Sequence, residues 1–131
     1  MIAAAAVPDG AVGIDVERAD AAGFDGFTSV AVHAAERVPS DPAEATRLWV
    51  RKEAVLKALG TGLRVDPRLI RLADTVNGPV VVDWPDPRPP NQVTLVDLDA
   101  PDGYLAALAV IGGSGLAYTH ASIRPATPAS L

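Results

Sequence analysis

The chain of 131 residues contains no cysteine, which excludes a disulfide framework and any metal site built on thiolates. No apolar run approaches the roughly 20 residues that a membrane-spanning helix needs, so we expect no membrane partner. Positive charge is also scarce. Eleven Lys and Arg residues against sixteen Asp and Glu residues give a net charge of −5, which argues against non-specific nucleic-acid binding. Nothing in the composition argues for secretion, and we expect a cytoplasmic protein.

Lysine is the rarest charged residue of the chain. Nine of the eleven cationic residues are arginine, and the two lysines, Lys52 and Lys57, lie within six positions of each other. Lysine carries a compact, mobile ammonium rather than the fixed planar fork of arginine. Such a group suits a phosphate whose position changes during a reaction.

The segment that carries both lysines predicts a helix with clear ends. Asp41 is a typical N-cap, Pro42 suits the first helical position, and Glu44 is the acid of a capping box. Gly60 provides the stop. Two stripes are expected on this helix. A buried one holds Leu48, Val55, Leu56 and Leu59, and a second line holds Trp49, Glu53 and Lys57.

Residues 12–17 (VGIDVE) alternate between apolar and small or acidic residues, which is typical of a half-buried strand. Asp15 and Glu17 therefore point to the same side, roughly 6.6–6.8 Å apart along the strand. Such a pair is usual at an exposed edge, but it can also be the acidic half of a Mg²⁺ site. Glu53 on the helix could complete the acidic cluster, with Lys52 and Lys57 beside it. Together these groups suit the handling of a diphosphate.

Two stretches in this order resemble the signature motifs of the 4′-phosphopantetheinyl transferases. They are residues 13–17 (GIDVE) and residues 49–57 (WVRKEAVLK), and the match continues through residues 58–63 (ALGTGL). The resemblance covers residues 11–63, and it is nearest to the C-terminal lobe of the long, two-lobed type. It implies an α+β fold in which an antiparallel sheet packs against one long helix and short helices.

The resemblance also implies a reaction and the residues that perform it. The family transfers the 4′-phosphopantetheine group from coenzyme A to a serine of an acyl or peptidyl carrier protein, with Mg²⁺ on the diphosphate and 3′,5′-ADP as the leaving group. Asp15 and Glu17 resemble the metal ligands on the strand. Glu53 resembles the helix ligand, which is also a candidate base for the serine hydroxyl. Lys57 resembles the lysine that assists the leaving group, and Lys52 a second phosphate contact.

The sequence departs from the family pattern in three places. Val50 stands where a small hydroxyl or thiol residue is usual, and the two motifs are closer together than in most members. The long type has a whole lobe before the first motif, which helps to grip coenzyme A. Here eleven residues precede Val12, and they contain no His, Lys or Arg.

These departures support a second hypothesis, that the chain is a truncated, catalytically impaired lobe that acts only as an interaction or partner subunit. A third hypothesis is another Mg²⁺-dependent diphosphate enzyme. A lone lobe would leave its first strands without their usual cover, and we therefore expect it to self-associate as a homo-oligomer.

The remaining segments predict one domain over residues 1–123 and a flexible tail over residues 124–131. We interpret Glu36, in a short helical turn over residues 33–38, as a solvated residue, with an auxiliary acid as the alternative. His33 and His120 have no partners at metal spacing and are interpreted as structural. Asn77-Gly78 predicts a hairpin between residues 69–72 and 79–84. Further strands are expected at residues 2–7, 27–32, 93–98, 104–111 and 116–123.

Overall fold

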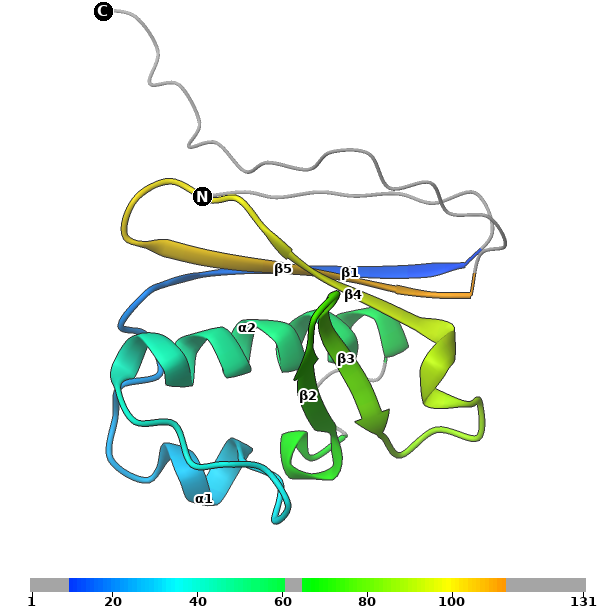
Figure 1. The fold of residues 1–131 in the computed structure, drawn as a ribbon, viewed down its shortest axis with the longest axis horizontal. Helices are drawn as coiled ribbons and strands as arrows, with labels where there is room; N and C mark the ends of the chain where they lie inside the picture. The colour runs from blue at the N-terminus through cyan, green and yellow to red at the C-terminus, as the bar shows by residue number, and fades with distance from the viewer. Residues whose placement is uncertain (1–9, 61–64, 113–131) are drawn as a thin grey trace, which may run out of the picture.

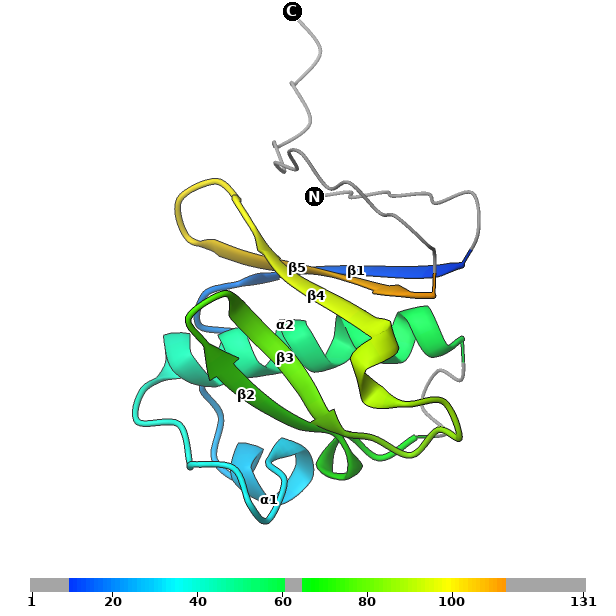
Figure 2. The ribbon, with the colours of Figure 1, turned by 45° about the vertical axis from the view of Figure 1, so that its right-hand side comes forward.

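The computed structural model describes residues 10–60 and 65–112, in which one long helix lies between two small sheets. The helix is α2 (Pro42–Leu59). On one side lies an antiparallel sheet of β1 (Ala11–Arg18), β5 (Tyr104–Ile111) and β4 (Val93–Leu98), in that order. On the other side lie the short helix α1 (Phe27–Ala31) and the hairpin of β2 (Arg71–Thr75) and β3 (Gly78–Asp83), as Figures 1 and 2 show. The α+β prediction is confirmed.

The ends of α2 follow from local chemistry, as predicted. The Asp41 side chain accepts a hydrogen bond from the backbone N–H of Glu44 at 2.8 Å, and Pro42 occupies the first turn. Gly60 ends the helix in the left-handed region at φ 72°, with its N–H on the carbonyl of Leu56. The carboxylate of Glu44 contacts Ser40 and Arg37.

The main hydrophobic core fills the space between α2, the inner face of the three-stranded sheet and the β2–β3 hairpin. Val55 and Leu56 of the predicted stripe are buried there, while Leu48 and Leu59 are partly buried at its margin. Burying a side chain of this size contributes roughly 1.5–3 kcal/mol. The other members come from all three elements and include Val50, Ala54, Ile70, Leu72, Val81, Trp84, Leu95, Ala107 and Ala109.

Strand β1 forms as predicted, and its small and acidic side chains face the helix. Gly13 and Asp15 are buried on the side of α2. Val12, Ile14 and Val16 lie on the opposite face of the sheet, where they pack against a second apolar cluster formed by β4 and β5. The strand therefore brings a carboxylate into the interior beside the helix.

Two predictions about the segment between β1 and α2 are wrong. Residues 27–32, expected as a strand, form α1, because Phe27 and Ala31 lie one turn apart and both pack towards α2. The Phe27 ring meets the Trp49 ring edge-on, with centroids 6.2 Å apart. Residues 33–38 form a turn without a helix, and the side chain of Glu36 is 4% exposed instead of solvated.

The β2–β3 hairpin, β4 and β5 confirm the strand predictions made for this half of the chain. Two short 3₁₀ helices, η2 (Pro67–Leu69) and η3 (Pro90–Gln92), lead into β2 and β4. The strands predicted at residues 2–7 and 116–123, the tail, and His120 lie outside the described residues. Within the described part of the chain, no helix has the length and apolar character that crossing a membrane requires.

Candidate functional site

Gly13 allows strand β1 to lie directly on α2. A Cβ atom at this position would stand 2.0 Å from the carbonyl oxygen of Ala54 and 2.4 Å from the backbone nitrogen of Ala58. Both are helix backbone atoms, which cannot withdraw without distorting α2, so only glycine fits this contact. The close approach brings Asp15, two residues further along the strand, against Lys57 on the helix.

Asp15 is the buried centre of the site. The side chain is 5% exposed, and its Oδ1 accepts a hydrogen bond from the Lys57 ammonium at 2.6 Å. Its second oxygen, Oδ2, is buried and accepts no hydrogen bond from any described residue. A buried carboxylate oxygen without a donor is costly, so Oδ2 is poised to accept a donor or a cation. Lys57 also donates to the carbonyl of Ile14 at 3.3 Å and remains half exposed.

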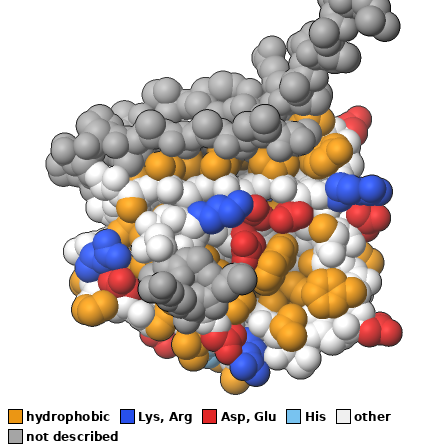
Figure 3. Space-filling view, turned by 180° about the vertical axis from the view of Figure 1, so that it is seen from behind, with side chains coloured by type: hydrophobic (Ala, Val, Ile, Leu, Met, Phe, Trp, Pro, Cys, Tyr) orange, Lys and Arg blue, Asp and Glu red, His pale blue; other side chains and the backbone are white. Residues whose placement is uncertain are grey.

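Glu17 and Glu53 complete an acidic group around Asp15. Burial raises the pKa of Glu17, and the charge of Asp15 raises it further, as does the hydrogen bond that a protonated Glu17 makes to the Asp15 side chain. Lys57 acts in the opposite direction. The pKa of Glu53 is likewise raised, first by burial and then by Asp15, against the lowering effect of Lys57. Viewed from behind, acidic side chains gather beside a basic one (Figure 3). The structure therefore places the two glutamates and Lys57 close enough to Asp15 for their charges to act on one another.

The donor set of this group fits a hard divalent cation, because Mg²⁺ takes carboxylate oxygens and leaves positions for phosphate oxygens. The free Oδ2 of Asp15 is an available ligand. The arrangement is not yet that of a formed metal centre. Among residues 10–60 and 65–112, no three His, Cys, Asp or Glu side chains are close enough together to hold a metal ion. A cation bound there would offset the negative charge of Asp15, which after burial is the next cause of the raised pKa values of Glu17 and Glu53.

Lys52 lies elsewhere, and its predicted contact with a phosphate has to be revised. Its side chain is fully buried, and its ammonium donates to the carbonyl of Ala31 at 2.7 Å, to Oε1 of Glu36 at 2.6 Å and to the carbonyl of Pro67 at 3.2 Å. These acceptors use all three of its N–H donors. Burial lowers the pKa of Lys52, and the Glu36 carboxylate partly offsets this effect. The ammonium is therefore an interior anchor.

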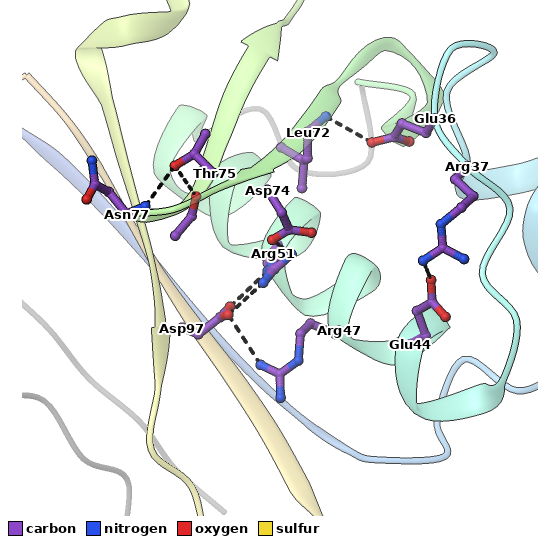
Figure 4. A network of polar contacts seen from close by, with 11 residues as sticks. Glu36, Arg37, Glu44, Arg47, Arg51, Leu72, Asp74, Thr75, Asn77 and Asp97 are labelled. Carbon is purple, nitrogen blue, oxygen red and sulfur yellow. Dashed lines mark hydrogen bonds and ion pairs between the residues drawn. The ribbon is translucent and has the colours of Figure 1, made fainter.

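Glu36, which sequence reasoning interpreted as solvated, joins separate segments of the chain. Its Oε1 also accepts from the backbone N–H of His33 at 2.7 Å. Its Oε2 accepts from the N–H of Leu72 at 2.9 Å (Figure 4). Through Lys52 it is tied to α1, α2 and η2. No local pattern announces this pair, because sixteen positions separate its members.

A second polar cluster that the sequence did not reveal surrounds Arg51. Its Nε and Nη2 donate to the two oxygens of Asp97 at 2.8 and 2.6 Å, and its Nη1 donates to Asp74 at 3.1 Å. Arg47 approaches the same Asp97 at 3.5 Å (Figure 4). With 3.6 residues per turn, Arg47 and Arg51 lie on the side of α2 opposite Glu53. The cluster is therefore separate from the Asp15 site.

Two solved structures share the fold. A holo-[acyl-carrier-protein] synthase from Thermotoga maritima is similar at a TM-score of 0.65 and 23% identity, over 78% of this chain and 62% of that one. A holo-ACP-synthase from Plasmodium yoelii is similar at a TM-score of 0.58 and 15% identity, over 79% of this chain and 94% of that one. At these identities the likeness establishes the architecture. This chain spans less than two thirds of the Thermotoga protein.

No curated protein sequence matches the chain. The sequence model of a family described as ACPS, 4′-phosphopantetheinyl transferase superfamily, matches residues 11–109. The matched region begins with β1, which carries Asp15, and extends through α2, which carries Glu53 and Lys57, into β5. The chain belongs to the 4′-phosphopantetheinyl transferase superfamily.

Proposed function

We propose that this chain transfers the 4′-phosphopantetheine group of coenzyme A to a serine of an acyl or peptidyl carrier protein, with Mg²⁺ as cofactor. One observation carries the proposal. Asp15 is buried against α2 with one oxygen on Lys57 and the other without a donor among the described residues. The partly buried Glu17 and Glu53 lie close enough for the charge of Asp15 to raise their pKa values. Partly buried carboxylates with perturbed pKa values can bind a divalent cation, and the mobile ammonium beside them can bind a diphosphate.

Glu53 is the proposed general base. Burial and the charge of Asp15 raise its pKa, which makes its carboxylate a stronger base than that of an ordinary glutamate. It would take the proton of the carrier serine while the serine oxygen bonds to the phosphorus that bears pantetheine. The bond from that phosphorus to the bridging oxygen breaks, and 3′,5′-ADP leaves with the electron pair.

Lys57 is the proposed stabiliser of the leaving group. Its side chain is half exposed, so its ammonium can turn from Asp15 towards an entering phosphate. Negative charge grows on the leaving phosphate as the bond breaks, and a fixed cation there lowers the barrier. When bound through Asp15, with Glu17 and Glu53, Mg²⁺ would supply further neutralisation of the diphosphate.

The test is transfer from labelled coenzyme A to an apo-carrier protein, with and without Mg²⁺. We expect transfer by the parent chain that is lost on chelation and in Glu53→Gln. Asp102→Asn is the matched acidic control, because this residue is exposed in the loop before β5. Transfer that proceeds equally in Glu53→Gln would contradict the assignment of the base.

The same assay separates the proposal from the non-catalytic alternative. A folded chain that binds an apo-carrier protein and coenzyme A without transferring the group would favour a partner subunit. A chain that hydrolyses the diphosphate without modifying the carrier would favour a different Mg²⁺-dependent enzyme. Intact-mass measurement of the carrier distinguishes the outcomes directly.

A further inference from the structure

A hollow on the side of α2 away from Glu53 is lined by arginine. It has a volume of about 560 Å³, and its walls are residues 35–39, the first half of α2, and β2. Four arginines line it, Arg37, Arg47, Arg51 and Arg71. Figure 4 shows the Arg37–Glu44 pair on one side of this region and the Arg51–Asp97 pair on the other. The volume lies in the range of small-molecule sites.

The two glutamates on the wall are already engaged. Glu36 accepts from Lys52 and from the backbone of His33 and Leu72. Glu44 accepts from Arg37 and from both the hydroxyl and the N–H of Ser40. Neither carboxylate therefore neutralises the arginines deeper in the hollow.

The arginines retain donors that the described residues do not use. Arg51 is held on three of its N–H groups by Asp97 and Asp74, which leaves two of its five donors. Arg47, 38% exposed, has only the 3.5 Å contact with Asp97. Arg71 makes no ion pair or side-chain hydrogen bond with the described part of the chain. Among the described residues the arginines of the hollow therefore keep free donors, while Asp74, which uses one carboxylate oxygen on Arg51, lies at its exposed margin.

The balance of charge around the hollow also favours an anionic ligand. Glu36 is neutralised by Lys52, so within the described residues the four arginines that line the hollow are matched by three carboxylates, those of Glu44, Asp74 and Asp97. A local excess of positive charge is unusual in a chain with a net charge of −5. Arginine forks match the oxygens of a phosphate group bidentately. The remainder of the wall is apolar and formed by Ala35, Pro39, Leu48, Leu72 and Ala73.

We propose that this hollow binds a small organic phosphate, with its phosphate on Arg47, Arg51 and Arg71 and its organic part on the apolar wall. Inorganic phosphate would fill only part of about 560 Å³. The ligand would occupy a site distinct from the proposed transfer site, because α2 separates the two. The proposal does not depend on the transfer reaction.

The test titrates adenosine 5′-monophosphate, adenosine and inorganic phosphate into the full chain in chelated buffer, by calorimetry and by backbone amide NMR shifts. We expect the nucleotide to bind at least about tenfold more tightly than adenosine or inorganic phosphate. Arg47→Gln and Arg71→Gln should each weaken nucleotide binding by about tenfold. Arg88→Gln and Lys57→Gln, which lie outside the hollow, should change it by less than about twofold.

Three outcomes would overturn the proposal. The first is no nucleotide binding up to about 10 mM. The second is binding that Lys57→Gln abolishes while Arg47→Gln and Arg71→Gln leave it intact, which would place the nucleotide at the Asp15 site. The third is that the arginine variants weaken binding of a carrier protein but not of the nucleotide, which would make the hollow a protein-docking surface. Circular dichroism of each variant confirms that it is folded.

Discussion

Lys52 and Lys57 of α2 make ion pairs of the same length but have different roles. The ammonium of Lys57 lies 2.6 Å from Asp15, and that of Lys52 lies 2.6 Å from Glu36. The Lys57 side chain is 51% exposed, whereas that of Lys52 is fully buried. The distance between ammonium and carboxylate therefore does not distinguish the roles of the two lysines, whereas the exposure of their side chains does.

The difference lies in the donors and acceptors that remain free. Lys52 satisfies all its N–H groups with Glu36 and two carbonyls, and both oxygens of Glu36 are occupied. At the other pair, one oxygen of Asp15 has no donor within residues 10–60 and 65–112, and the lysine reaches solvent. The Lys52–Glu36 pair, called the closed pair below, stabilises the fold, while the Lys57–Asp15 pair, called the open pair, can take a ligand. Four experiments test this difference between the two pairs.

The largest effect is expected on activity, from removal of the open pair's carboxylate. Asp15→Ala should lower transfer by more than about 100-fold, because the free oxygen that would bind the cation is lost. The protein should remain folded, since the variant also removes a buried oxygen that lacks a donor. Transfer by Asp15→Ala at the parent rate would show that the open pair is not the reaction site.

The closed pair should dominate stability. Lys52→Met should lower the free energy of unfolding by about 3–5 kcal/mol, because Glu36 would remain buried without its cation. The matched change Lys57→Met should cost less, about 1–3 kcal/mol, because Asp15 stays buried but the ammonium that is removed is half exposed. Urea unfolding of both variants measures the difference. Equal losses would mean that the two pairs are not distinct in the way their burial indicates.

A steric change tests how β1 carries the open pair. Gly13→Ala should destabilise the protein by about 1–3 kcal/mol and also reduce transfer, because a methyl group would push β1 away from Ala54 and Ala58. The reduction in transfer should persist at temperatures where the variant is fully folded. A variant that is both stable and fully active would contradict the close contact of strand and helix.

The smallest effect concerns the pH dependence of the metal-free protein. The pKa of Glu53 is raised in the folded state, so its ionisation destabilises the fold. Glu53→Gln removes that destabilisation and should raise the Tm slightly at pH 8. The gain should shrink as the pH falls towards the pKa of Glu53, where the parent side chain is also neutral. A gain in Tm that stays constant between pH 4 and pH 8 would show that the ionisation of Glu53 is not its cause.

Local signals in the sequence sufficed for α2 and the hairpin. The Asp41 cap, the Gly60 stop and the Asn77-Gly78 turn act through neighbouring residues, so the pattern alone predicts them. α1 was predicted wrongly as a strand, because its aromatic and β-branched residues favour strands. The packing of Phe27 on Trp49 decides otherwise.

The candidate site was predictable only in part. The grouping of Asp15, Glu17, Glu53 and Lys57 followed from strand and helix periodicity together with the family resemblance. The burial of Lys52 did not, because its partners come from α1, η2 and the turn at Glu36, which are distant in sequence. For the same reason the Arg51–Asp97 pair, 46 positions apart, left no signal.

The most direct test compares Lys57→Met and Lys52→Met in single-turnover transfer, with each rate divided by the folded fraction. We predict that Lys57→Met slows transfer by about 100-fold or more and lowers the Tm less than Lys52→Met does. Lys52→Met should lower the Tm strongly yet keep the rate per folded molecule within about threefold of the parent. If Lys52→Met slows the folded protein as much as Lys57→Met does, the division into a closed structural pair and an open reactive pair is wrong.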